Sequence, residues 1–98
     1  MFRHIVLLTL EPDTTDAQRR AIIDGLRSLP AAIDSIRAYA CGLDAQIAEG
    51  NSDIGVVGDF DDEAGYLLYR DHPVHRKVIA ECIAPVLASR SAIQYSLE

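Results

Sequence analysis

The segment Arg3–Leu10 (RHIVLLTL) restricts the fold most, because it is β-rich and apolar on both faces. Successive side chains of a strand point to opposite faces. Ile5 and Leu7 share one face here. Val6 and Leu8 share the other. An antiparallel strand with one solvated face alternates apolar and polar residues instead. The pattern therefore predicts a strand that is covered on both sides.

A helix is predicted after this strand. Thr15 and Gln18 have the spacing of a capping box, in which each side chain binds the other residue's backbone N–H. Apolar residues then recur at helical spacing, and Pro30 is expected to end the helix. These apolar residues are Ile22, Ile23, Leu26 and Leu29.

Two further strands follow. Ile36–Gly42 (IRAYACG) and Asp53–Phe60 (DIGVVGDF) have strand character, and Leu43–Ser52 between them is predicted to be a loop. Gly55 and Gly58 lie inside the second of these strands. Glycines in such places indicate a bend or a close approach of another group to the backbone.

The second helical region is interrupted. Ala64–Arg70 is a short helical segment, and His72 before Pro73 ends it, since the residue before a proline avoids the α region. A new helix is predicted from Pro73, with His72 near its N-cap. Pro85 should tighten or stop this helix, and Ser91–Leu97 is the predicted last strand.

The order β-α-β-β-α-α-β predicts an α+β, ferredoxin-like fold with an antiparallel four-stranded sheet in one domain, residues 1–98. Helices of this fold cover one face of the sheet and leave the other open. Because that face carries apolar residues, we expect a second copy to cover it, sheet to sheet, in a homodimer. The argument requires that the more polar set of residues on these strands does not form the open face. This set contains Arg37, Tyr39, Gln94 and Ser96.

Composition excludes several classes of partner. The net charge of −6 disfavours nucleic acid and anionic membrane surfaces. No apolar run reaches the ~20 residues of a membrane span, and no signal-peptide pattern is present. Cys41 and Cys82 are too few for a disulfide framework and fit buried free thiols. We therefore expect a cytoplasmic protein.

The segment Tyr69–His75 (YRDHPVH) is the densest in chemistry. His75 falls in the first turn of a helix, where the dipole disfavours a protonated imidazole, so it is a usable base near pH 7. The hydroxyl of Tyr69 can hold a carbonyl oxygen. A base and a donor are the minimum for removing a proton beside a carbonyl.

Two other interpretations remain open at this point. In the first, His72 caps a helix, His75 satisfies a backbone group and Tyr69 is a core residue. In the second, His72 and His75 bind a metal ion together with His4. No signature of a serine or cysteine nucleophile or of a phosphate loop is present.

The sequence resembles the stress-responsive A/B barrel (Dabb) family along essentially its whole length. The resemblance rests on MFRHIVLLTL at the start, on Asn51 and Asp53, on Asp59-Phe60 and above all on Tyr69-x-x-His72-Pro73-x-His75. It implies a dimeric α/β barrel of ferredoxin-like protomers. Most members have no assigned activity, and some are linked to stress responses.

One plant member of the family, olivetolic acid cyclase, closes a polyketide chain by aldol condensation without a cofactor. Its histidine base and assisting tyrosine fall on His75 and Tyr69 here, and two ligand-binding histidines fall on His4 and His72. Arg70 and Asp71 replace the apolar pair expected beside a polyketide pocket. Some relatives hold magnesium through backbone carbonyls near the end of the first helix; otherwise no cofactor is expected.

The sequence thus leaves several functions open. The first is a homodimer with a pocket for a small hydrophobic or carbonyl-containing ligand and no catalysis. The second is a cofactor-free cyclase, lyase or isomerase that uses His75 and Tyr69. A cofactor-free oxygenase is the third, because other dimeric α/β barrels oxidise activated phenols. A purely structural protein would fill the pocket with side chains.

Overall fold

A computed structural model describes residues 1–97 and contains one antiparallel sheet. Its strands lie in the order β2-β3-β1-β4, so β1 and β3 are central. The split pattern is therefore the ferredoxin-like one that the sequence predicts. The strands are β1 (Phe2–Leu10), β2 (Ile36–Leu43), β3 (Ile54–Phe60) and β4 (Leu87–Ser96).

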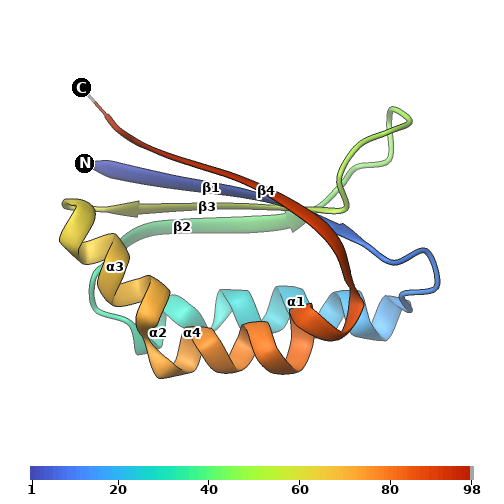
Figure 1. Ribbon diagram of the computed structural model, residues 1–98, viewed down its shortest axis with the longest axis horizontal. Coiled ribbons are helices and arrows are strands. Elements are labelled where there is room, and N and C mark those ends of the chain that lie inside the picture. Colours follow the sequence, from blue (N-terminus) through green and yellow to red (C-terminus); the bar gives the residue numbers. More distant parts are fainter. Residues whose placement is uncertain (98) are drawn as a thin grey trace.

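All the helices lie on one face of the sheet, and the other face is bare (Figure 1). The helices are α1 (Asp16–Arg27), α2 (Leu29–Ala32), α3 (Glu63–Asp71) and α4 (Pro73–Val78); a π-helical turn, η1 (Ile79–Ile83), and a 3-10 turn, η2 (Ala84–Val86), follow α4. Within residues 1–97, no helix is long and apolar enough to cross a membrane.

The core lies between the helices and the inner face of the sheet. Phe60, Ile22, Leu29 and Ile54 are its largest fully buried side chains. Cys41 and Cys82 are free thiols that pack, half-buried, at the edge of this core. The apolar stripe of the predicted first helix is thus confirmed as the stripe that faces the sheet.

The bare face carries the less polar set of side chains on both edge strands. Along β4, Ile93 and Tyr95 lie on this face and are 57% and 40% exposed. Leu7 of β1 joins them and is 45% exposed. Gln94 and Tyr39 instead point toward the helix side, where they make contacts described below. Two of the four residues in the condition that the sequence argument set, Tyr39 and Gln94, are therefore absent from the bare face.

Several predicted boundaries were wrong. Pro30 does not end the helical region but lies in the first turn of α2, where its missing N–H costs nothing. The strand β4 begins at Leu87 rather than Ser91, because Leu87 already pairs with Leu10 of β1. The sequence hid this extension because Ala88 and Ser89 have little strand propensity.

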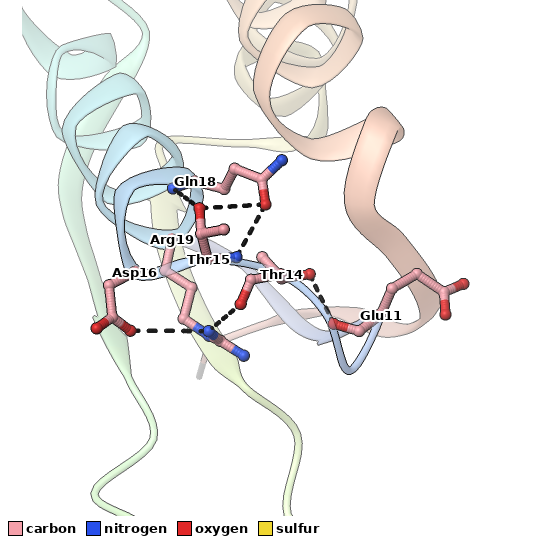
Figure 2. Close-up of polar contacts among 6 residues, drawn as sticks. All are labelled: Glu11, Thr14, Thr15, Asp16, Gln18 and Arg19. Carbon is pink, nitrogen blue, oxygen red and sulfur yellow. Dashed lines mark hydrogen bonds and ion pairs between the residues drawn. The ribbon is translucent and has the colours of Figure 1, made fainter.

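The predicted capping box of α1 is confirmed (Figure 2). The Oγ1 of Thr15 accepts a hydrogen bond from the N–H of Gln18 at 3.1 Å, and Gln18 Oε1 accepts one from the N–H of Thr15 at 2.9 Å. Just before the helix, the hydroxyl of Thr14 donates to the carbonyl of Glu11 at 2.6 Å. The capping box thereby satisfies the N–H groups of Thr15 and Gln18, which the helix itself leaves unpaired.

Replacing Thr15 with Ala should lower the free energy of unfolding by about 1 kcal/mol, because an N-cap oxygen is lost. Urea unfolding at a fixed protein concentration measures the change. Thr15→Ser keeps the oxygen and should retain most of the stability. Equal stability of Thr15→Ala and the unmodified protein would contradict the role of this cap.

Candidate functional site

The break between α3 and α4 builds the site. His72 has extended backbone angles (φ −65°, ψ 135°), which end α3 and start α4 at Pro73. The Nδ1 of His72 accepts a hydrogen bond from the N–H of Val74 at 3.1 Å. The helix start and the N-cap predicted from the His-Pro pair are therefore confirmed, and the cap is made by the imidazole itself.

This cap frees a carbonyl for His75. In an unbroken helix, the N–H of Val74 would bind the carbonyl of Arg70, four residues earlier. Here that N–H is bound by His72, and the Nδ1 of His75 lies 3.0 Å from the oxygen of Arg70. A carbonyl only accepts, so Nδ1 carries the proton. In the neutral imidazole, Nε2 is then the basic nitrogen.

His75 is kept neutral mainly by burial. Its side chain is 8% exposed, and this burial lowers its pKa, while the hydrogen bond to Arg70 acts in the opposite direction. The sequence argument gave the helix dipole as the cause. The structure identifies desolvation as the larger one, but the direction is as predicted. A neutral imidazole with a free Nε2 has the form of a general base.

Tyr69 lies directly against His75, with ring centroids 4.2 Å apart. Its hydroxyl lies 2.9 Å from the hydroxyl of Tyr39, so the two form a hydrogen bond. Burial raises the pKa of Tyr69 to about 12. The phenol therefore stays protonated, and when Tyr39 donates to it, its own proton is available for a ligand oxygen.

His4 completes the group from β1. It is 4% exposed, and its ring centroid lies 6.1 Å from that of Tyr69 and 4.8 Å from that of Tyr66. The amide nitrogen of Gln94 lies 2.8 Å from His4 Nδ1. Since an amide NH₂ donates, Nδ1 accepts and Nε2 carries the proton. The tautomers of His4 and His75 are therefore opposite, and the pair offers one donor and one acceptor.

These side chains border a cavity of about 370 Å³ between the helices and the inner face of the sheet. Of the four residues that the sequence predicts for a site, His4, Tyr69 and His75 line the cavity, whereas His72, predicted to bind a ligand, does not. The remaining walls are largely aliphatic, and the π-helical turn η1 contributes Ile79 and Ile83.

Sequence reasoning missed Tyr39, Tyr66 and Gln94. Tyr66 lies three residues before Tyr69 in α3, so helical spacing alone could have placed both on one face. The sequence signal for Tyr39 was weaker: it was the glycine at position 58, which pairs with Tyr39 in the sheet. A Cβ on Gly58 would lie 3.2 Å from the ring of Tyr39. The close approach predicted for the strand glycines is thus confirmed at this position.

The structure does not gather the three histidines into a metal site. Among residues 1–97, no three His, Cys, Asp or Glu side chains form a group that could hold a metal ion. The magnesium site near the end of α1 stays a prediction of the resemblance. There the carbonyl of Gly25 accepts hydrogen bonds from both the hydroxyl and the N–H of Ser28, and the carbonyl of Leu29 accepts one from the N–H of Ile33.

Comparison with models of protein families assigns the chain to one family. The sequence profile of the Stress responsive A/B Barrel Domain (Dabb) matches residues 2–97. The chain belongs to this family. The resemblance noted from the His-Pro motif is thereby confirmed. The search of curated proteins gave no significant match.

Solved structures confirm the fold of this Dabb protein. A dimeric ferredoxin-like protein of unknown function from Thermobifida fusca YX is 45% identical, with 98% of this chain and 90% of that chain covered and a TM-score of 0.90. A dimeric protein of unknown function from Bacteroides fragilis NCTC 9343 is 26% identical, with 98% and 95% covered and a TM-score of 0.87. A hydroxynitrile lyase from Passiflora edulis is 17% identical and shares the fold. The match covers 99% of this chain and 93% of that chain, with a TM-score of 0.85.

The buried histidines should make the protein less stable as the pH falls below neutrality. Burial, aided by the charge of Arg90, lowers the pKa of His4 from 6.5 to about 4. Between these values the unfolded chain binds the proton and the folded chain does not, so stability is complete above pH ~6.5 and declines toward pH ~4. A pKa difference of this size corresponds to ~3 kcal/mol.

The free energy of unfolding in urea is measured from pH 7.5 to 4 for the unmodified protein and for His4→Gln, which lacks the titrating group. The variant should lose less stability over this range than the unmodified protein. The difference between the two losses should reach ~3 kcal/mol. Carboxylates titrate in both proteins and cancel in the difference. Parallel pH profiles would show that His4 has its ordinary pKa in the folded protein.

Proposed function

We propose that the cavity binds a small, mainly apolar molecule with a carbonyl group, and that His75 removes a proton from the carbon beside it. The observation that carries this proposal is the hydrogen bond between His75 Nδ1 and the carbonyl of Arg70. It leaves Nε2 unprotonated in a side chain that borders a largely apolar cavity. Burial keeps this imidazole neutral at pH 7.

The proposed step is a cofactor-free proton transfer. The Nε2 of His75 takes the proton, the C–H electrons move into the carbonyl, and the oxygen gains negative charge. Tyr69 donates its hydroxyl hydrogen to that oxygen, with Tyr39 donating to Tyr69 in turn. The resulting enolate can then attack a second carbonyl or take back a proton. Cyclase, isomerase and aldol-type lyase reactions share this step, and a hydroxynitrile lyase, whose reaction is a different one, has the same fold.

Hydrogen–deuterium exchange of a simple ketone tests the base directly. We expect the protein to accelerate exchange beside the carbonyl of 4-phenylbutan-2-one in D₂O, followed by NMR. His75→Ala should slow this exchange by about 10²–10⁴, the usual contribution of a general base. Tyr69→Phe should slow it by about 10², because an oxyanion donor is lost.

Lys77→Ala is the matched control, because Lys77 lies on the exposed side of the same helix, outside the cavity lining. It should exchange the ketone at the unmodified rate. If His75→Ala does so too, His75 is not the base. Ketone binding without exchange would favour the binding-only function, and oxygen consumption with an electron-rich phenol would favour the oxygenase.

We further propose that the protein is a homodimer joined through the bare face of the sheet. The apolar side chains Leu7 and Ile93 lie there, and the one charged pair near them is internally satisfied. Arg3 Nε and Nη2 donate to the two carboxylate oxygens of Asp59 at 2.8 and 2.9 Å. The 45%-identical relative is described as dimeric. Covering such a face with a second copy removes apolar surface from water.

Ile93→Asp should convert the dimer to monomer at micromolar concentration, because a carboxylate would be buried without a partner. Leu68→Asp is the matched control: Leu68 is 66% exposed on α3, away from the sheet. Sedimentation velocity and native mass spectrometry measure both. A dimer that survives Ile93→Asp would place the interface elsewhere, and a monomeric unmodified protein would remove the homodimer.

A further inference from the structure

The cavity wall is basic although the chain is acidic. The chain has 15 acidic residues against 9 lysines and arginines, yet no Asp or Glu lines the cavity. Four nitrogen bases line it instead: His4, Arg70, His75 and Arg90. An anion inside the cavity therefore meets no carboxylate on the lining, and the charge that it meets depends on which of these four groups carries an uncompensated proton.

Arg90 has no counter-charge among residues 1–97. The ion pairs of the described chain involve five other arginines. Arg70, the other arginine of the cavity wall, is neutralised by Asp71, with Nε 3.0 Å from its carboxylate. Arg90 is also exposed, so its guanidinium can reach both solvent and the cavity. It is thus the cation on this wall with its donors available.

The position of Arg90 joins this charge to the histidines. Arg90 and Gln94 lie four residues apart on the same face of β4, opposite Leu8 and His4 of β1. Gln94 holds the imidazole of His4. Four residues of strand span about 13 Å, so the strand positions of Arg90 and His4 lie that far apart along the cavity floor, and the charge of Arg90 still acts on His4. Val6 and Leu8 supply an apolar surface between them.

We propose that the cavity selects small organic acids, with the carboxylate bound by Arg90 at the rim and the apolar body lying along Val6 and Leu8. This rests on the proposed function and names the class of ligand for the same cavity. A guanidinium binds a carboxylate through two parallel, charge-assisted hydrogen bonds. The preference is for a single negative charge, because one arginine is uncompensated and the chain carries a net charge of −6.

Matched acids and amides test the proposal without knowledge of the natural ligand. The probes are phenylacetate, 4-phenylbutanoate and octanoate, each compared with its amide, which has the same shape and no charge. Binding is followed through the backbone NMR signals of the cavity-lining residues. The best-fitting acid should bind the unmodified protein at least about tenfold more tightly than its amide.

Arg90→Gln should abolish this difference by weakening the acid and leaving the amide unchanged. Arg20→Gln removes the same charge from an exposed arginine of α1, outside the cavity lining, and should keep the difference. An equal loss in both variants would mean that only the overall charge matters, and would overturn the role of Arg90. Equal binding of acids and amides would overturn the acid preference and leave the pocket intact. If no pair shifts these signals, the ligand pocket itself is refuted.

Discussion

One displaced hydrogen bond governs the site. The N–H of Val74 binds the imidazole of His72 rather than the carbonyl of Arg70, because Pro73 interrupts the helix there. The liberated carbonyl then holds His75. The helix break and the tautomer and orientation of His75 thus follow from a single local change. His72 acts by positioning its neighbour, although it does not line the cavity.

The alternation of side chains along β1 divides the molecule into two functional surfaces. His4, Val6 and Leu8 face the helices and line the cavity. The intervening residues, Ile5 and Leu7, face away from the helices, toward the side that we propose to be the dimer interface. Because both sets sit on one rigid central strand, a shift of β1 against a partner would be felt by His4. The cavity and the proposed interface therefore share β1 without any residue belonging to both.

Much of the fold was readable from the sequence because it depends on local chemistry. The capping box at Thr15, the break at Pro73 and the apolar stripe of α1 are each set by residues close together in the chain. The start of β4 was not readable, because Leu87 is held by pairing with Leu10, far away in the sequence. Propensity carries no information about such pairing.

The site was readable only in part for the same reason. Tyr69, His72 and His75 form one motif, so their spacing identified them together. Tyr39 and Gln94 enter the site from the two edge strands, at opposite ends of the sheet order. Their partners, Tyr69 and His4, are 30 and 90 residues away in the chain. Only the register of the sheet brings them together, and the residues around Tyr39 or Gln94 do not by themselves reveal which residue each will lie opposite.

Gly58 shows that this site depends on volume as well as on reactive groups. It pairs with His4 on one side and with Tyr39 on the other, in the centre of the sheet. The rings of Tyr39 and Phe60 occupy the space that its side chain would need, at 3.2 and 3.3 Å from the position of a Cβ. Even one added methyl group would press on the ring that binds Tyr69. A side chain at position 58 would therefore damage the site while leaving every functional group in the sequence.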